Sequence, residues 1–132
     1  AVESEVGPER FKRFRFIEGS VSDFELCRQV CQGVDYILHE AGFISVPQSI
    51  EDPLWCNRVN VDGTLNMLVA AREAGVQRFV YASSSAVYGD DETIPKVEET
   101  IGKPLSPYGN SKLIDEPVSY KHLRAHETGA YL

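Results

Sequence analysis

The chain has 132 residues, of which 42% are hydrophobic and 25% are charged, so it is long enough for one folded domain and too apolar for a disordered segment. Its net charge of −7 disfavours nucleic acid or an anionic membrane as a partner, because either would need a basic face. No apolar run approaches the roughly 18 residues of a membrane-spanning helix, and the first residues lack the apolar segment of a signal peptide.

The three cysteines, Cys27, Cys31 and Cys56, give an odd number and no CxxC spacing. This pattern argues against a disulfide framework and against a zinc site, so no metal is expected. Buried, reduced thiols are expected instead, and with them a cytoplasmic location.

Two types of element alternate along the first part of the chain. Phe14–Ile17 is predicted to be a short strand. A helix is predicted next, capped by Ser22 or Asp23 and running to about Gln32. Val34–His39 is a nearly continuous apolar run, which is typical of a strand covered on both faces in a parallel sheet.

The same alternation continues toward the end of the chain. Pro53–Ala74 shows helical spacing of apolar residues and is followed by Gly75, a natural helix stop. Gln77–Ala82 is predicted to be the third strand, and a last helix is predicted to begin near Tyr108. This order predicts an α/β fold: a partial, Rossmann-like, doubly wound parallel sheet of three strands in chain order, with helices on both faces.

In such a sheet, ligands bind beyond the carboxyl ends of the strands, where small residues let a ligand approach the backbone. Tyr108 and Lys112 are four residues apart at the start of a predicted helix, so their side chains point the same way. A lysine ammonium beside a phenol favours the phenolate, which makes Tyr108 a candidate general base or acid. Ser84 follows the third predicted strand and could share a substrate hydroxyl with Tyr108.

Five segments of the chain resemble motifs of the extended short-chain dehydrogenase/reductase superfamily. In chain order they are His39–Gly42 (HEAG), Ile44–Ser49 (ISVPQS), Asn60–Asn66 (NVDGTLN), Phe79–Gly89 (FVYASSSAVYG) and Leu105–Lys112 (LSPYGNSK). Within that superfamily the chain is similar to the NAD-dependent epimerase/dehydratase family, and most of all to UDP-hexose (UDP-N-acetylglucosamine or UDP-glucuronate) 4-epimerases. The resemblance covers about residues 14–116.

The resemblance implies an isomerase that acts on a UDP-sugar through a 4-keto intermediate, with NAD as cofactor and a homodimeric full-length parent. Tyr108 would take the proton from the sugar 4-hydroxyl while hydride passes from C4 to NAD and later returns to the other face. Lys112 would bind the nicotinamide ribose, and Ser84, helped by Ser85, would contact the sugar. The cofactor-binding residues implied in this way are Ala41, Gly42, Ala82, Tyr108 and Lys112.

The chain also departs from the family pattern. It lacks the glycine-rich phosphate loop and the first two strands, so residues 1–116 are predicted to be a partial NAD(P)-binding Rossmann domain. Ser20 and Val59 replace polar residues that usually face the cofactor. We therefore expect weak NAD binding and no measurable turnover from the chain as it stands.

Residues 117–132 do not resemble the family. Pro117 is predicted to end the last helix. The segment is either a divergent natural tail or the translation of a sequencing adapter. His122 and His126 within it are not assigned to a metal site.

Two other functions stay open on the sequence. A half-Rossmann unit without catalysis could act as an interaction module through its exposed sheet edge. Another extended short-chain reductase or dehydratase is also possible, although a dehydratase needs Thr-Asp-Glu where this chain has Ser84-Ser85-Ala86.

Overall fold

The structure, a computed structural model, describes residues 2–124 of the chain and the side chains of residues 2–119. Its elements follow in the order α1 (Val2–Val6), α2 (Pro8–Phe11), α3 (Phe24–Cys31), β1 (Tyr36–His39), α4 (Val46–Glu51), α5 (Pro53–Asn57), the π-helical segment η1 (Arg58–Asp62), α6 (Gly63–Ala74), β2 (Arg78–Tyr81), the 3₁₀ turn η2 (Ser85–Tyr88) and α7 (Pro107–Arg124).

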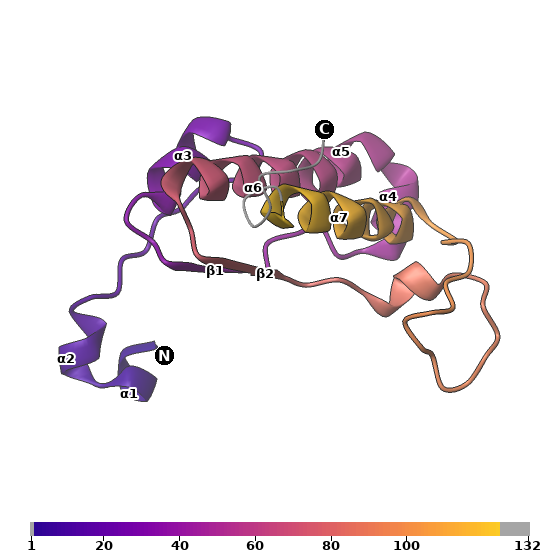
Figure 1. The fold of residues 1–132 in the computed structure, drawn as a ribbon, viewed down its shortest axis with the longest axis horizontal. Helices are drawn as coiled ribbons and strands as arrows, with labels where there is room; N and C mark the ends of the chain where they lie inside the picture. The colour runs from indigo at the N-terminus through magenta and orange to yellow at the C-terminus, as the bar shows by residue number, and fades with distance from the viewer. Residues whose placement is uncertain (1, 125–132) are drawn as a thin grey trace.

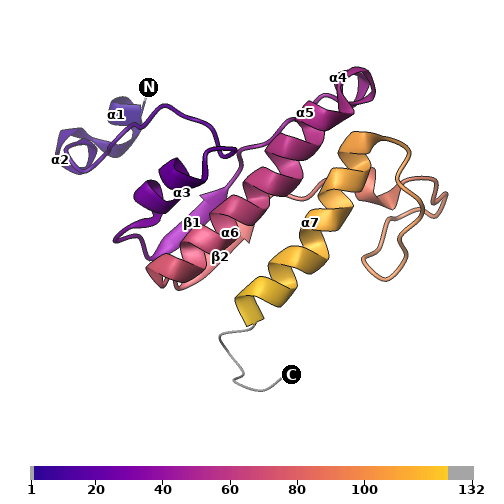
Figure 2. The ribbon, with the colours of Figure 1, turned by 90° about the horizontal axis from the view of Figure 1, so that it is seen from above.

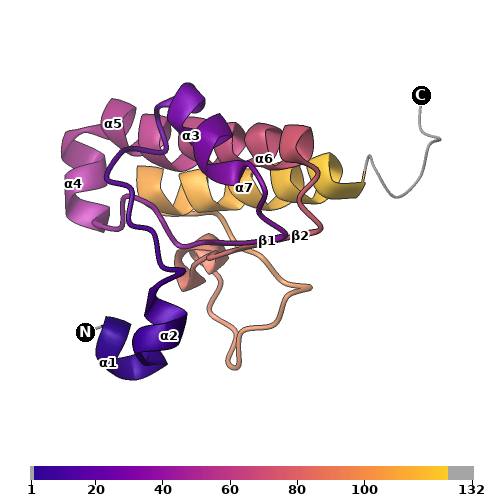
Figure 3. The same ribbon diagram turned by 90° about the vertical axis from the view of Figure 1, so that its left-hand side faces the viewer.

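The centre of the fold is a parallel pair of strands, β1 and β2, in which Tyr36 lies opposite Arg78 and His39 opposite Tyr81. Figures 1 and 3 show α3, α6 and α7 on the same side of this pair. Side chains alternate accordingly, since Ile37 is buried under the helices whereas Leu38 on the other face is 74% exposed. The described residues therefore form a two-layer unit.

Local signals in the sequence explain the helices that cover the strands. The Asp23 carboxylate accepts a hydrogen bond from the Leu26 backbone N–H and so caps α3, and α6 ends at Gly75, which has a φ of 71°. Between these helices and the strands lies the apolar core, formed by Cys27, Cys31, Ile37, Leu68, Ala70, Ala71 and Phe79. The three cysteines are free and buried, as predicted.

Two features of the predicted sheet are wrong. Phe14–Ile17 is not a strand, and no described helix covers the face of the sheet that Leu38 occupies. In the doubly wound strand order 3-2-1-4-5, the third and fourth strands are not neighbours. Among the described residues, no strand lies beside Phe14–Ile17 to supply hydrogen bonds, and Phe16 is 75% exposed.

The helix α7 continues past Pro117, so the prediction that this residue ends the helix is wrong. Proline removes one backbone hydrogen bond, but packing of the helix face compensates. Asp115 and Ser119, on either side of Pro117, are buried, and Val118 packs against the core. Figure 2 shows α7 beside α5 and α6, which lie in line with each other.

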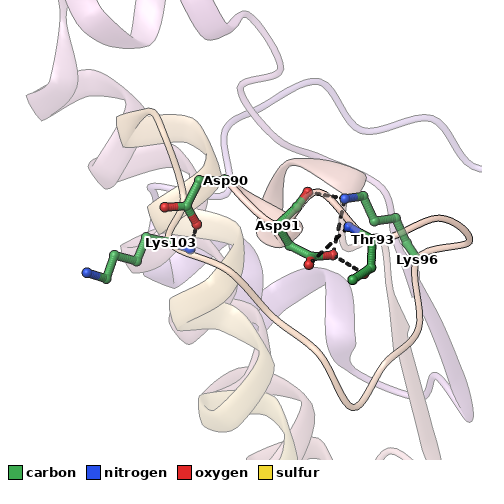
Figure 4. A network of polar contacts seen from close by, with 5 residues as sticks. All are labelled: Asp90, Asp91, Thr93, Lys96 and Lys103. Atoms are coloured by element: carbon green, nitrogen blue, oxygen red, sulfur yellow. Dashed lines mark hydrogen bonds and ion pairs between the residues drawn. The ribbon is translucent and has the colours of Figure 1, made fainter.

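A loop of residues 89–106 joins η2 to α7, and polar contacts at its start organise it (Figure 4). The Asp91 carboxylate accepts hydrogen bonds from the Thr93 hydroxyl (2.6 Å) and from the Lys96 ammonium (3.1 Å). The Asp90 carboxylate accepts a hydrogen bond from the Lys103 backbone N–H (2.6 Å), which joins the start of the loop to a residue near its end. These contacts join the first residues of the loop to one another and to Lys103 near its end.

None of the described helices is long and apolar enough to cross a membrane. Among the described residues, no group of three or more His, Cys, Asp or Glu side chains could hold a metal ion.

Candidate functional site

Tyr108 and Lys112 lie on the buried side of the first turns of α7. Pro107 occupies the first helical position, and the Ser106 hydroxyl accepts a hydrogen bond from the Gly109 backbone N–H, so the helix begins just before Tyr108. The two side chains are one helical turn apart, as predicted, with 9% and 6% exposure. The Lys112 ammonium donates to the Ala82 carbonyl oxygen (3.2 Å), which places it at the carboxyl end of β2.

Gly42 and Asn60 lie beside the Lys112 ammonium. A Cβ on Gly42 would lie 3.5 Å from Lys112 Nζ and 3.3 Å from Asn60 Oδ1, so the bare glycine keeps this space open. Asn60 is buried in the π-helical segment, where Oδ1 accepts from the Phe43 backbone N–H (2.7 Å). Its Nδ2 donates to the Phe43 carbonyl oxygen (3.0 Å) and to the Ser111 hydroxyl (2.8 Å). The amide thereby ties the segment after β1 to α7.

The serine segment after β2 opens into a pocket of about 740 Å³. The Ser84 hydroxyl caps η2 by accepting from the Ala86 backbone N–H (3.2 Å), and the Ser83 hydroxyl donates to the Glu116 carboxylate (2.6 Å). The residues lining the pocket are Phe79, Tyr81, Ser83, Ser84, Ser85, Val87, Tyr88, Glu98, Ile101, Glu116 and Ser119.

The pocket lining includes both predicted substrate residues, Ser84 and Ser85, and neither Tyr108 nor Lys112. The two groups nonetheless adjoin, because a Cβ on Gly109 would lie 2.9 Å from the carbonyl oxygen of Ala86, next to Ser85. Convergence of the Ser84, Tyr108 and Lys112 polar atoms on one reacting centre stays a prediction.

A second polar group lies buried behind Lys112. His39 Nε2 is 3.2 Å from Thr64 Oγ1, which is 3.5 Å from Asp115 Oδ2. Burial, and then the Lys112 charge, lowers the pKa of His39 to about 4, so His39 is neutral at pH 7. Burial raises the pKa of Asp115 to about 7, although Lys112 and the Thr64 hydrogen bond act in the opposite direction.

Tyr81, in the pocket, is unsuited to the role assigned to Tyr108. Burial, with the charges of Glu116 and Asp115, raises the pKa of Tyr81 to about 12. Its phenol therefore keeps its proton at neutral pH and is a poor general base.

Sequence reasoning did not assign a site role to Asn60, and it missed Asp115. Asn60 stands in a quoted motif, but its partner Ser111 is 51 residues away, and Asp115 is likewise 51 residues from Thr64. The signal that could have found Asp115 is its place on α7, three residues after Lys112 and so on the same face.

Comparison with known proteins identifies the family of the chain. The model of the NAD dependent epimerase/dehydratase family matches residues 2–128. The chain belongs to this family. It is 39% identical over 120 residues to the UDP-glucose 4-epimerase of Streptomyces lividans, a match that covers 87% of this chain and 36% of the relative. The chain spans about a third of the length of the curated relatives it matches.

Solved structures of family members share the fold. The UDP-Glc/GlcNAc 4-epimerase of Campylobacter jejuni superimposes with a TM-score of 0.81 at 32% identity, covering 96% of this chain and 38% of that one. DesIV, the dTDP-glucose 4,6-dehydratase of Streptomyces venezuelae solved with NAD bound, superimposes with a TM-score of 0.83 at 32% identity, covering 94% of this chain and 38% of that one. The described unit is therefore part of a Rossmann-like α/β fold, as predicted.

Proposed function

We propose that this chain carries the catalytic Ser-Tyr-Lys part of an NAD-dependent nucleotide-sugar 4-epimerase. The observation that carries the proposal is the position of Tyr108 and Lys112 on the buried face of α7. The Lys112 ammonium there donates a hydrogen bond to the carbonyl oxygen of Ala82, directly after β2. Family membership and the curated UDP-glucose 4-epimerases that the chain resembles support it.

NAD fits the residues that end the two strands. The bare backbone at Gly42 lies next to the Lys112 ammonium, and a Cβ there would crowd the Asn60 amide oxygen. Ala41, Gly42, Ala82, Tyr108 and Lys112 would hold the cofactor. When bound, NAD accepts hydride from a sugar carbon and returns it.

The protein side chains would then handle the proton and the sugar. The Tyr108 phenolate takes the proton of the sugar 4-hydroxyl as a ketone forms, and gives it back when the ketone is reduced on its other face. The Lys112 ammonium stabilises the negative charge on the Tyr108 oxygen. Ser84 donates to the sugar O4, and Ser85 assists.

The substrate proposed is a UDP-hexose. The pocket beside Ser84 combines hydroxyl groups, the aromatic rings of Tyr81 and Tyr88, and the carboxylates of Glu98 and Glu116. This chemistry suits a neutral sugar, because hydroxyls and carboxylates accept its hydroxyl hydrogens and aromatic rings contact its apolar faces. We also propose that the whole enzyme is a cytoplasmic homodimer, in keeping with the buried free thiols and the family resemblance.

A dehydratase is the second candidate, because DesIV superimposes as well as the epimerases do. Elimination of water needs an acid and a base beside the sugar. This chain has Ser84, Ser85 and Ala86 where that class has Thr-Asp-Glu, so we place epimerisation first.

A graft tests the proposal directly. Residues 14–116 would replace the matching segment of the Streptomyces lividans epimerase, and conversion of UDP-glucose to UDP-galactose would be followed by anion-exchange chromatography. We expect turnover that a Tyr108→Phe graft loses. A folded graft that binds NAD but yields no epimer would contradict the proposal, and a 4-keto-6-deoxy product would favour the dehydratase.

A further inference from the structure

The Asp115 carboxyl is the most deeply buried acidic group described, with 1% exposure. It lies three residues after Lys112, and hence on the same face of α7. Thr64 on α6 contacts it (3.5 Å), and His39 on β1 contacts Thr64 (3.2 Å). The Thr64 hydroxyl therefore links the Asp115 carboxyl on α7 to His39 on β1.

The Lys112 ammonium has no described ion-pair partner. Its described hydrogen bond is to a neutral carbonyl oxygen, that of Ala82. The ion pairs described for residues 2–119 involve other cations, namely Lys12, Arg28 and Lys96. A buried ammonium that lacks an opposite charge is costly, so a carboxyl one helical turn away matters to it.

Apart from Lys112, the titratable groups that face Asp115 carry no positive charge at pH 7. His39 from β1 is neutral at pH 7 because burial lowers its pKa to about 4. Tyr81 from β2 keeps its proton, and burial likewise raises the pKa of the Cys56 thiol on α5. Glu116, the neighbouring carboxylate on α7, is hydrogen-bonded to Ser83 at the pocket.

We infer that Asp115 is a positioning residue for Lys112: held by Thr64, its carboxylate is the buried counter-charge of the ammonium, and its protonation removes that counter-charge. The inference rests on the proposed function for one point, the use of the Lys112 charge beside Tyr108 and the cofactor. Because the pKa of Asp115 lies near 7, the counter-charge is present above neutral pH and absent below it. The neutral range is therefore where the Lys112 ammonium gains or loses its buried counter-charge.

Carbon-13 NMR of the chain labelled at its aspartate carboxyls tests the coupling. Asp115→Asn identifies the Asp115 resonance by its disappearance. In the unsubstituted chain we expect this carboxyl to titrate near pH 7, and in Lys112→Met to titrate about one pH unit or more higher, since a nearby cation lowers a carboxyl pKa by about that much. Lys12→Met, which removes an exposed cation that follows α2, is the matched control and leaves the midpoint unchanged.

A second measurement follows the Lys112 side chain itself. In the unsubstituted chain, we expect the Lys112 ε-carbon resonance, assigned by its loss in Lys112→Met, to show an inflection at the Asp115 midpoint. An Asp115 midpoint that Lys112→Met leaves unmoved, or a Lys112 resonance without that inflection, would overturn the inference. Neither NMR titration uses cofactor or substrate. If the chain shows the coupling between Asp115 and Lys112 but the grafted enzyme shows no turnover, the proposed epimerase function is rejected and the inference stands.

Discussion

Lys112 on α7 donates a hydrogen bond to the carbonyl oxygen of Ala82, 30 residues earlier and directly after β2. This contact fixes the start of α7 against the carboxyl end of the sheet. It places the ammonium next to Gly42, which follows β1, so one side chain joins the two strand ends where a Rossmann-like fold binds its ligand.

Replacing Tyr108 by phenylalanine separates proton transfer from binding. The backbone N–H of residue 108 still donates to the Ser49 hydroxyl, so the start of α7 is kept. In the grafted enzyme we expect NAD affinity to stay within about twofold and turnover to fall by about 10²–10⁴, the usual contribution of a general acid–base group. Isothermal titration with NAD and a product assay measure the two effects. A Tyr108→Phe graft with undiminished turnover would remove Tyr108 from the mechanism.

A methyl group at Gly42 tests the proposed cofactor edge. Gly42→Ala introduces no backbone strain at a positive φ, but the new carbon lies 3.3 Å from Asn60 Oδ1 and 3.5 Å from Lys112 Nζ. We expect NAD affinity in the graft to fall about tenfold. Gly33→Ala is the control: it lies in open space at a φ of +71°, so it should lower stability by about 1 kcal/mol and leave NAD affinity unchanged. Equal NAD affinity in the Gly42→Ala graft would contradict the assignment.

Elements with a complete local signal were predicted from the sequence. The helix α3 has its Asp23 cap, α6 has Gly75 at its end, and β1 is an apolar run. Phe14–Ile17 has an equally strong local signal, but a strand also needs a neighbour, and the sequence pattern does not say which strands pair. Pro117 is the converse case, since burial of Asp115 and Ser119 holds the helix that the local signal would end.

Asn60 is expected to stabilise the site through the segment after β1. Asn60→Ala removes both hydrogen bonds to the Phe43 backbone and leaves that N–H without its amide partner. An unsatisfied buried group costs about 1–3 kcal/mol, so the free energy of unfolding in urea should fall by about that amount. Asn57→Ala, an exposed position three residues earlier, should change it by less than about 0.5 kcal/mol. Similar losses at both positions would show that the Asn60 contacts carry no special weight.

In the candidate site, residues related by local spacing were predicted from the sequence, and residues that meet only through folding were not. Tyr108 and Lys112 were found because their relation is local, one helical turn. The side chains that surround Lys112 were not, because Asn60 reaches Ser111 and Thr64 reaches Asp115 only in the folded chain. Nothing in the spacing of these residues shows that α6 and α7 pack together.

The pKa values of His39 and Asp115 are shifted in opposite directions, so their effects on the pH dependence of stability oppose each other. The folded pKa of His39 is lowered from 6.5 to about 4, so between these values the unfolded chain holds an extra proton and stability rises with pH. The folded pKa of Asp115 is raised from 3.8 to about 7, so over nearly the same range the folded chain holds the extra proton and stability falls with pH. The two effects should nearly cancel, and the free energy of unfolding should contain little pH dependence from this pair between about pH 4 and pH 6.5.

Single substitutions should expose each half of the cancellation. With Asp115→Asn, the remaining His39 term makes the free energy of unfolding rise by up to about 3 kcal/mol from pH 4 to pH 6.5, since one pKa unit corresponds to about 1.4 kcal/mol. With His39→Gln, the Asp115 term makes it fall by a similar amount from pH 4 to pH 7. Urea denaturation at a series of pH values, followed by circular dichroism, measures both slopes. Slopes of the same sign in the two variants would show that burial does not shift the pKa values of His39 and Asp115 in opposite directions.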